Sequence, residues 1–240
     1  MRGYAGDPAW SQTTRSCVGR SVRFAYFGSD IDRRSWFCIY GGACAPEPDR
    51  ATCSVVDSQI RAGDLVLRLW TAADQSTIDD IVTSSRTDLD SWLPGLESDL
   101  ADFETFIDHA GRSAKEGTGW YYCVELGGVV VGQCSVEARD GGTAEIGYWI
   151  RSDRTNAGLA TRAVRAMCGP AADHGFKSLV IHCDGGNERS AAVAQKAGFT
   201  HVATVDLGVS FPGTNAQTGR EMTWHLALGG LRPKARSPTT

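Results

Sequence analysis

The alternation of apolar and polar residues becomes regular from about Ile60 onward. The stretch "DLVLRLW" (64–70) alternates as a half-buried strand does, and "TAADQSTIDDIVTSS" (71–85) carries apolar residues at helical spacing behind a threonine cap. The stretch "SDLADFETFIDHAGRS" (98–113) predicts a second amphipathic helix, which Gly111 is expected to close. The pattern therefore predicts a strand followed by two helices.

Two runs rich in β-branched and aromatic residues flank Gly127-Gly128, a pair that a tight primed turn accepts, and they predict a hairpin over 119–138. Pro170 removes a backbone donor and crowds the carbonyl of Ala166, so the helix that contains it should kink or end near Gly169. The elements predicted after the hairpin are a strand at 143–150, a helix at 158–175, a strand at 177–184, a helix at 187–198 closed by Gly198, and two strands at 199–209 and 219–228.

The composition suits one globular domain with an appendage, because 42% of the 240 residues are hydrophobic and 22% are charged. A net charge of −4 and a pI near 5.7 argue against the broad attraction that basic proteins exert on DNA or RNA, so no nucleic-acid partner is expected. No apolar run approaches the ~20 residues of a membrane span, and the N-terminus lacks the apolar segment of a signal peptide. We therefore expect a cytoplasmic protein without a membrane partner.

The two ends of the chain lack a regular pattern. Residues 1–58 carry seven Arg and no Lys and mix Gly, Ser and Pro with aromatic residues, which is typical of a poorly ordered extension. The alternative is a small aromatic-rich docking segment. Residues 229–240 read as a polar, disordered tail, which leaves 59–228 as the folded domain.

The cysteines do not indicate a metal site. Four of them lie in apolar strand or helix patterns, where a thiol behaves as a small buried hydrophobe: Cys123, Cys134, Cys168 and Cys183. The other four contain no CxxC pair, which structural zinc sites normally use: Cys17, Cys38, Cys44 and Cys53. His174, His182 and His201 have no spacing that suggests a metal or a catalytic triad.

A loop of small residues, "DRTNAGLATRAV" (153–164), joins the strand at 143–150 to the next helix. The first N–H groups of a helix have no intrahelical partner, so such a junction is suited to bind an anion. Between residues 151 and 165 one acid, Asp153, stands against four arginines: Arg151, Arg154, Arg162 and Arg165. The local charge fits an anion site, and the alternative is a solvated helix face.

Two signatures in register carry a family resemblance. The segment "AEIGYWI…DRTNAGLATRAVRAM…VIHCDGGNERSAAVAQKAGF" resembles the acetyl-CoA-binding half of the GNAT acetyltransferases, in particular the RimJ/RimL type, and the resemblance covers roughly Asp64 to Leu228. It implies an α/β fold with a mixed, mostly antiparallel central sheet flanked by helices and a splayed strand pair that holds the cofactor. The chain departs from the family's phosphate loop at Thr155, where Arg or Gln is usual, and at Asn156, which replaces a common glycine.

The resemblance implies that the anion is the pyrophosphate of acetyl-CoA. Its expected partners are the loop residues Thr155, Asn156, Ala157, Gly158, Leu159 and Ala160. The backbone of Tyr148, Trp149 and Ile150 is expected to pair with the pantetheine arm as a neighbouring strand would. Asn187 is expected to bond the pantetheine, to cap its helix, or both.

The same resemblance suggests how the acetyl group is transferred. Glu145, in the strand beside the cofactor, is the candidate base, acting through a water; the alternative is a structural carboxylate. Ser190 is expected near the cofactor sulfur, where its hydroxyl can protonate the departing thiolate. Tyr148 and Trp149 are expected to contribute packing side chains rather than catalysts.

The function implied is N-acetylation of a primary amine, either a protein N-terminus or a small molecule such as an antibiotic or an amino-acid conjugate. The alternative is a coenzyme-A-binding module without transfer activity. No metal is expected, and a homodimer is compatible with the family. From Asp88 to Gly111 the chain is acidic with no Lys or Arg, and Trp92 lies in this run, so Trp92 is the candidate wall of an acceptor pocket that attracts a cationic amine. The alternative places Trp92 in the core.

Overall fold

Eight strands form a single mixed sheet in the order β1-β2-β3-β4-β5-β6-β8-β7. The computed structural model describes residues 57–93, 102–207, 214 and 216–229. The strands are β1 (Gln59–Ala62), β2 (Leu65–Leu69), β3 (Gly119–Leu126), β4 (Val129–Arg139), β5 (Thr143–Ile150), β6 (Ser178–Asp184), β7 (Thr200–Asp206) and β8 (Arg220–Ala227). Only β5 and β6 pair in parallel, so the predicted mixed, mostly antiparallel sheet is confirmed.

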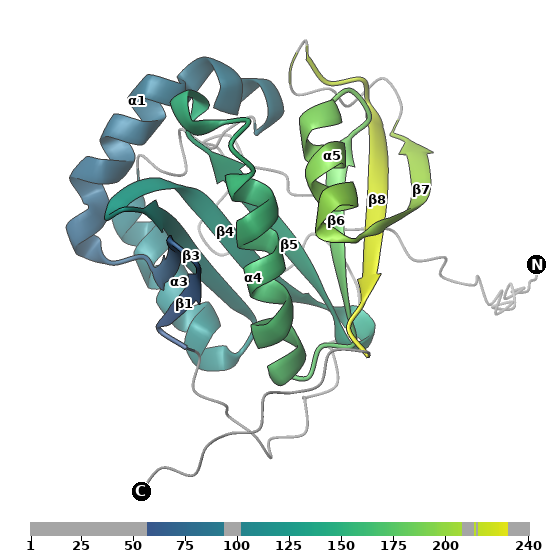
Figure 1. Ribbon diagram of the computed structural model, residues 1–240, viewed down its shortest axis with the longest axis horizontal. Helices are drawn as coiled ribbons and strands as arrows, with labels where there is room; N and C mark the ends of the chain where they lie inside the picture. The colour runs from purple at the N-terminus through teal and green to yellow at the C-terminus, as the bar shows by residue number, and fades with distance from the viewer. Residues whose placement is uncertain (1–56, 94–101, 208–213, 215, 230–240) are drawn as a thin grey trace, which may run out of the picture.

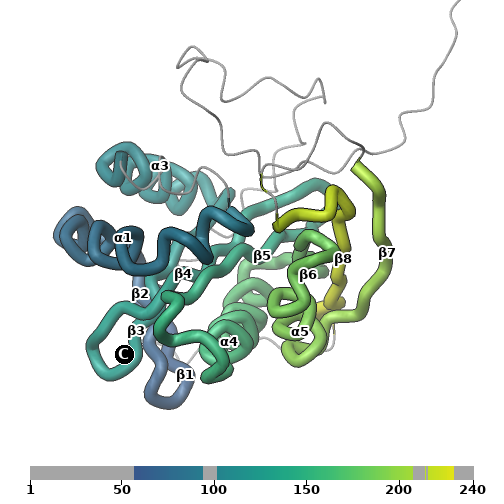
Figure 2. Tube along the Cα trace, turned by 90° about the horizontal axis from the view of Figure 1, so that it is seen from above, coloured from purple at the N-terminus to yellow at the C-terminus, as the bar shows by residue number. Residues whose placement is uncertain are grey.

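Helices cover both faces of this sheet. Helices α1 (Gln75–Trp92) and α3 (Phe103–Glu116) lie on one face, and α4 (Leu159–Asp173) and α5 (Glu188–Ala197) lie on the other, as Figures 1 and 2 show. We call these the α1/α3 face and the α4/α5 face. The three-layer arrangement places each strand side chain on one face or the other, because successive residues of a strand point to opposite sides.

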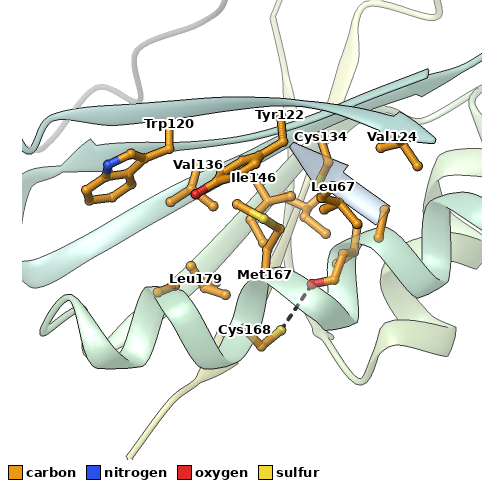
Figure 3. Packing of buried hydrophobic residues seen from close by; sticks show 14 of the residues in the cluster. Leu67, Trp120, Tyr122, Val124, Cys134, Val136, Ile146, Met167, Cys168 and Leu179 are labelled. Atoms are coloured by element: carbon orange, nitrogen blue, oxygen red, sulfur yellow. Dashed lines mark hydrogen bonds between the residues drawn. The ribbon is translucent and has the colours of Figure 1, made fainter. Parts of the chain in front are cut away.

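The alternation of each strand divides the core into two clusters. Leu67, Tyr122 and Ile146 pack against Met167 of α4 in the larger cluster (Figure 3), and each of these four side chains is at most 2% exposed. A second cluster on the α1/α3 face joins buried strand residues to helix residues: Trp70, Ile78, Ile81, Leu89, Phe103, Tyr121, Cys123, Val130 and Trp149. Both clusters fix the sheet against its helices through apolar burial.

Several predicted boundaries were wrong by part of a turn or more. Helix α1 begins at Gln75, after a 3-10 turn over Ala72–Asp74. Helix α3 begins at Phe103 because the Asp102 side chain accepts a hydrogen bond from the backbone N–H of Thr105. It passes through Gly111 and ends at Gly117, whose φ of 71° gives the left-handed cap that was predicted for Gly111.

Pro170 does not end its helix, because α4 continues to Asp173. Proline within the last turn leaves only a few hydrogen bonds behind it, so the helix loses little. Other terminators are confirmed: Gly198 caps α5 in the left-handed region, and Gly127-Gly128 with φ of 60° and 80° forms the turn between β3 and β4.

A short hairpin that was not predicted precedes the first predicted strand. β1 pairs with β2 around Gly63-Asp64, and Gly63 has a φ of 71°. A Gly-Asp pair between two short runs is itself a hairpin signal, so the sequence contained the information. The residues just before β1 also join the fold, because the Tyr122 hydroxyl donates to the carbonyl of Asp57 at 3.0 Å. The predicted extension at 1–58 and the predicted tail at 229–240 lie mostly outside the described residues.

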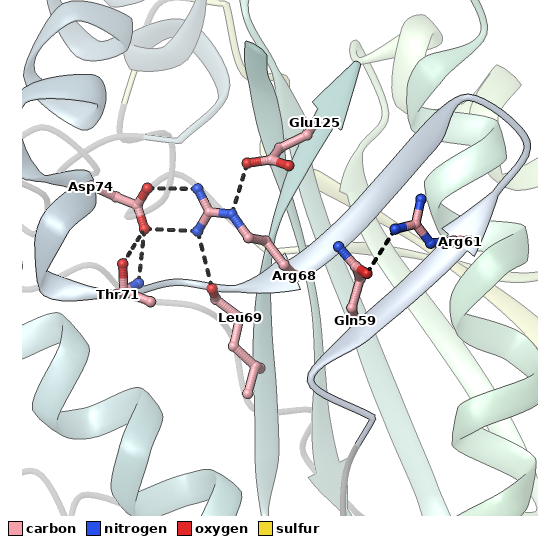
Figure 4. A network of polar contacts seen from close by, with 7 residues as sticks. All are labelled: Gln59, Arg61, Arg68, Leu69, Thr71, Asp74 and Glu125. Carbon is pink, nitrogen blue, oxygen red and sulfur yellow. Dashed lines mark hydrogen bonds and ion pairs between the residues drawn. The ribbon is translucent and has the colours of Figure 1, made fainter. Parts of the chain in front are cut away.

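A partly buried ion pair fixes the 3-10 turn before α1 to the sheet. Arg68 of β2 donates two hydrogen bonds to the Asp74 carboxylate, at 2.8 and 2.7 Å, and one to Glu125 of β3 at 2.7 Å (Figure 4). Asp74 also accepts from the backbone N–H and the hydroxyl of Thr71. The guanidinium therefore ties β2, β3 and the turn that leads into α1 together.

Candidate active site

β5 and β6 are hydrogen-bonded neighbours over a short distance only. Residues 143–145 pair with residues 178–180, and beyond this point the two strands diverge (Figure 1). β5 remains paired with β4 along its whole length. The predicted splayed strand pair is therefore present, with the open edge of β5 facing β6.

The backbone of β5 shows which groups line this open edge. The N–H of Arg151 donates to the carbonyl of Val131 in β4 at 2.9 Å. The N–H and C=O groups of successive residues alternate between the two edges of a strand. Those of Trp149 therefore also point toward β4, whereas those of Tyr148 and Ile150 point toward β6. The geometry favours Tyr148 and Ile150 over Trp149 as backbone partners for a strand-like ligand such as the pantetheine arm.

The predicted phosphate loop lies at the end of β5, where α4 begins. Gly158 is the residue before the helix and has a φ of 73°, and a Cβ built there would meet nothing within 4 Å. Asn156 has a φ of 63°, so it occupies the left-handed region that the family's glycine would occupy, and asparagine tolerates this region better than most residues. The space beside Gly158 is therefore open, and the start of α4 offers the kind of helix N-terminus that can bind an anion.

The arginines around the loop are engaged elsewhere in the fold. Arg151 pairs with Asp153 at 3.0 Å and with Asp80 of α1 at 3.2 Å, and Arg162 pairs with Asp64. Arg165 donates to the carbonyl of Lys196. Two of the four arginines, Arg151 and Arg162, therefore pair with acids that lie far away in the chain, which reduces the positive charge that the sequence suggested for the loop.

The predicted catalyst Ser190 lies on the α4/α5 face, beside the open edge of β5. Its hydroxyl is 2.8 Å from the hydroxyl of Tyr148, which also donates to the Ser190 carbonyl at 3.2 Å. Burial raises the pKa of Tyr148, so its phenol stays protonated at neutral pH. Asn187 accepts from the backbone N–H of Ser190 at 3.0 Å, which is the helix-capping role. Sequence reasoning had treated the Tyr148 side chain as packing only.

The predicted base Glu145 lies on the opposite face of the sheet. It is 5% exposed, and Arg139 donates to one of its oxygens at 3.0 Å and to Glu137 at 3.1 Å. Burial raises the pKa of Glu145, whereas the Arg139 guanidinium and His182 act in the lowering direction. The Tyr121 hydroxyl donates to Glu137 at 2.9 Å and is 3.1 Å from His109 of α3. Glu145 is thus one member of a polar network on the α1/α3 face.

The two predicted catalysts lie on opposite faces of the sheet. Trp149 belongs to the cluster under α1 and α3, and Ile146 belongs to the cluster under α4, so Glu145 and Tyr148 point to opposite sides. A ligand held on the α4/α5 face can therefore expose a reactive group to a second ligand on the α1/α3 face. The arrangement suits a proton acceptor on one side and a proton donor on the other.

Sequence reasoning missed Arg139 and Glu137. They lie two residues apart in β4, so they share a face, and the Glu137–Glu145 register places both beside the predicted base. The signal that could have found them is the tight connection after Arg139, since Arg139 pairs with Thr143 and fixes the register of the two strands.

Trp92 is the last residue of α1 and is half-buried. The neighbouring Ser91 carbonyl accepts a hydrogen bond from Thr214, in the connection between β7 and β8, at 2.7 Å. The end of α1 therefore lies at a rim formed by two distant parts of the chain. A surface hollow of about 410 Å³ near the other end of α1 is lined by ten residues, none of them predicted for the site: Arg68, Asp74, Ser76, Thr77, Asp80, Glu125, Gly128, Val129, Val130 and Arg151.

The described thiols agree with the sequence in part. Cys123, Cys134 and Cys168 are buried, whereas Cys183 of β6 is half-buried; the four earlier cysteines lie outside the described residues. Across the described ranges no three or more His, Cys, Asp or Glu side chains gather as metal ligands. Within the same ranges, no helix has both the length and the apolar character to cross a bilayer.

Comparisons with solved structures place this fold among acetyltransferases. RimL, the ribosomal L7/L12 alpha-N-protein acetyltransferase in complex with coenzyme A, superposes with a TM-score of 0.64 at 18% identity, covering 70% of this chain and 97% of its own. The microcin C7 self-immunity acetyltransferase MccE, in complex with acetyl-CoA and AMP, gives 0.63 at 19%, covering 72% and 98%. RimJ of Mycobacterium smegmatis, in complex with a CoA-disulfide, gives 0.60 at 21%, covering 72% and 87%.

The fold and the open strand pair define an acetyl-CoA-dependent acyltransferase. The profile of the acetyltransferase (GNAT) domain matches residues 64–200, which is more than half of the chain. The chain therefore belongs to the GNAT acetyltransferase family. Among curated protein sequences, none gives a significant match.

Proposed function

We propose that this protein transfers the acetyl group of acetyl-CoA to a primary amine that approaches from the α1/α3 face. The observation that carries the proposal is the placement of Ser190 and Glu145 on opposite faces of the sheet, beside strands that stop pairing at residue 145. The cofactor occupies the α4/α5 face, and the acceptor occupies the other.

Acetyl-CoA supplies an acetyl thioester. The N–H groups of Leu159 and Ala160 bind its pyrophosphate, Gly158 permits their close approach, and Thr155, Asn156 and Ala157 shape the loop. The backbone of Tyr148 and Ile150 holds the pantetheine arm, and Asn187 combines its capping role with a contact to the same arm. These residues orient the thioester carbonyl toward the opening between β5 and β6.

Two groups manage protons in this scheme. An α-amino group has a pKa of about 7.7–8, so part of it is already uncharged at neutral pH, and a modest base is sufficient. Glu145 is the candidate base on the acceptor side, through a water. Ser190, whose hydroxyl is 2.8 Å from Tyr148, delivers the proton that the leaving thiolate needs.

The class of acceptor is proposed from the chemistry of the amine and from the solved structures that this chain resembles. RimL bears the name of a protein α-amino acetyltransferase, and MccE was crystallised with a nucleotide. Both acceptor classes, a protein N-terminus and a small-molecule amine, are therefore compatible with this fold. The described thiols Cys123, Cys134, Cys168 and Cys183 are free, which fits a reaction in the reducing cytoplasm, and a homodimer is compatible with the proposal.

The test is the release of free thiol from acetyl-CoA in the presence of separate amines. The panel contains tripeptides with free N-termini, free lysine, spermidine and an aminoglycoside, with N-acetylated tripeptides as blocked controls. We expect thiol release that depends on one class of unblocked amine, with the product identified by mass spectrometry. Binding of acetyl-CoA by calorimetry without amine-dependent release would instead support a coenzyme-A-binding module without activity.

A further inference from the structure

His182 lies on the acceptor side of the opening, although its sequence context suggested no role. Its neighbours Ile181 and Cys183 face α4 and α5, because Ile181 belongs to the cluster under α4 and Cys183 interacts with Ser190. His182 therefore points to the α1/α3 face, as Glu145 does. Val180, which pairs with Glu145, is two residues before His182, so the imidazole lies just beyond the point where the strands diverge.

One ring nitrogen of His182 is held by two side chains of β8. Nδ1 is 3.3 Å from the Thr223 hydroxyl and 3.7 Å from a carboxylate oxygen of Glu221. The exposed fractions of the His182 and Glu221 side chains are 17% and 15%, so the pair is sheltered but reachable. The Thr223 hydroxyl can accept a hydrogen bond from Nδ1, and the Glu221 carboxylate, beyond hydrogen-bond distance at 3.7 Å, lies on the same side of the ring, so both groups are compatible with the tautomer that carries the proton on Nδ1. Nε2 is then left with its lone pair.

Glu145 is a buried carboxylate with one oxygen already occupied. Burial raises the pKa of Glu145, whereas Arg139, which donates to one of its oxygens at 3.0 Å and also binds Glu137, acts in the lowering direction. An imidazole whose Nδ1 faces a hydroxyl and a nearby carboxylate resembles the arrangement that many hydrolases use for proton abstraction, so His182 is a second candidate base on this face.

We infer that His182 is a catalytic residue that accepts the proton of the acceptor amine at Nε2, and that Glu221 is its positioning residue. The inference rests on the proposed function and assigns the role of proton acceptor to His182 instead of Glu145, while Glu145 still binds the amine. As the amine nitrogen forms a bond to the acetyl carbon, its proton passes to Nε2. The carbon–sulfur bond then breaks, the Ser190 hydroxyl gives its proton to the thiolate and regains one from solvent, and the imidazolium loses its proton to solvent.

The charged groups around His182 are those of three strands. Glu145 of β5, backed by Arg139 of β4, lies across the opening, and Glu221 and His225 lie on β8. Asp184, two residues further in β6, is occupied by the turn at Thr218 and Gly219. The carboxylates Glu145 and Glu221 therefore both favour the imidazolium that forms during the reaction.

The kinetic test compares three variants over pH 5.5–9 with the best amine of the panel and with a second amine of different pKa. His182→Gln should lower kcat/KM for the amine about 100-fold or more, the range of general base catalysis, with an unchanged dissociation constant for acetyl-CoA. Glu221→Gln should lower kcat. Glu145→Gln should mainly raise KM for the amine.

Two surface variants provide matched controls. His201→Gln removes an exposed histidine of β7, and Glu116→Gln removes an exposed carboxylate of α3, and both should leave the pH profile unchanged. The inference is overturned if the kcat/KM of His182→Gln still falls at acidic pH with both amines as that of the wild type does. It is also overturned if Glu145→Gln is the variant whose pH profile loses this fall.

A second measurement does not depend on turnover. Nitrogen-15 NMR of the histidine side chains should show neutral His182 with its proton on Nδ1 in the wild type, and Glu221→Gln should weaken this preference. A proton on Nε2 in an active wild-type enzyme contradicts the role of His182 but leaves the proposed acetyl transfer standing. Failure of every amine to promote thiol release contradicts the proposed function itself, and with it the inference.

Discussion

Asp74 is only 7% exposed, yet its surroundings favour the charged form. The hydrogen bonds from Arg68 lower the pKa of Asp74 against the opposing effect of burial, and Thr71 adds two further donors. A carboxylate with a lowered pKa stabilises the folded state above its ordinary value of 3.8, and this stabilisation is lost as the pH falls through the lower folded value.

Asp74→Asn should therefore destabilise the protein at pH 7. The change leaves the Arg68 charge with Glu125 alone, and we expect the free energy of unfolding to fall by about 2–3 kcal/mol. The difference from the wild type should narrow as the pH is lowered below 4, roughly, because the wild-type carboxylate is then protonated too. Urea unfolding at several pH values measures both effects. Asp79→Asn, at an exposed position of the helix that follows, is the control, and equal losses for the two variants would contradict the assignment.

The hydroxyls of Ser190 and Tyr148 form one unit, since they are 2.8 Å apart and Tyr148 also binds the Ser190 carbonyl. Ser190→Ala should lower kcat by about 10²-fold while leaving the affinity for acetyl-CoA nearly unchanged, the pattern of a group that acts in the transition state. Tyr148→Phe should lower kcat less, and the double variant should be no worse than Ser190→Ala. Additive losses in stopped-flow or steady-state assays would show that the two hydroxyls act separately.

The predicted phosphate loop keeps an ordered conformation although its sequence departs from the family pattern at Thr155 and Asn156. Asn156 takes the left-handed conformation with a φ of 63°, and the Thr155 hydroxyl donates to the Ser152 carbonyl at 3.0 Å, which closes the loop on itself. Ser152 in turn donates its N–H to the Ser85 hydroxyl of α1 at 3.0 Å. The loop is thus held in shape by its own hydrogen bonds and by a helix of the opposite face, and its family departure does not disturb the start of α4.

Gly158→Glu should raise the dissociation constant of acetyl-CoA by at least tenfold, about 1.4 kcal/mol. Its side chain adds a negative charge at the point of anion approach, and the free protein should still fold because a Cβ there meets nothing within 4 Å. Gly158→Gln supplies the bulk without the charge, and Gly158→Ala reports the strain of a φ of 73°, about 1 kcal/mol. Calorimetry should rank the three affinities with Gly158→Glu the weakest. Equal affinities of Gly158→Glu and Gly158→Gln for acetyl-CoA would contradict the electrostatic explanation.

The elements with strong local signals are those that the sequence predicted well. Gly127-Gly128, Gly198 and the strand at 143–150 all carry turn or periodicity patterns that tertiary contacts only reinforce. The start of α3 was misplaced because Asp102 caps it through a side-chain hydrogen bond that several nearby residues could equally have supplied. The start of α1 was misplaced because the Asp74 side chain accepts from Thr71 and closes a separate 3-10 turn before the helix. Local pattern predicts that a helix exists better than it predicts where the helix begins.

The whole molecule adds what no local pattern contains. The family resemblance predicted Glu145 and Ser190 near the cofactor, but their placement on opposite faces of the sheet follows from the sheet order and from the alternation of side chains along β5. Arg139, Glu221 and Thr223 reach the site only because hairpin register and the β6–β8 pairing bring them there. The pairing of Arg151 with Asp80, 71 positions earlier, likewise changed the meaning of an arginine cluster that looked free in sequence.

The surroundings of Trp92 are also set by the whole molecule. The end of α1 meets the connection between β7 and β8 through the hydrogen bond from Thr214 to the Ser91 carbonyl, across 123 positions of the chain. Trp92 is adjacent to this contact, and exposed carboxylates at the helices on this face include Asp88, Asp102, Glu104 and Asp108. The proposal that Trp92 contacts a cationic acceptor rests on this half-buried indole and on the negative charge around it, which would raise the local concentration of an amine.

Trp92→Ala should raise KM for the amine while sparing the affinity for acetyl-CoA, because the indole lies on the α1/α3 side and the cofactor on the other. Trp92→Phe keeps an aromatic wall and should restore most of the affinity. Leu89→Ala, on the buried side of the same helix, is the reference for core loss and should lower stability by about 2–5 kcal/mol. Added salt should weaken spermidine more than a tripeptide, since screening acts most on the acceptor with more charges. If Trp92→Ala destabilises the protein as Leu89→Ala does, or if salt affects both acceptors alike, Trp92 belongs to the core and the acceptor binds closer to Glu145 and His182.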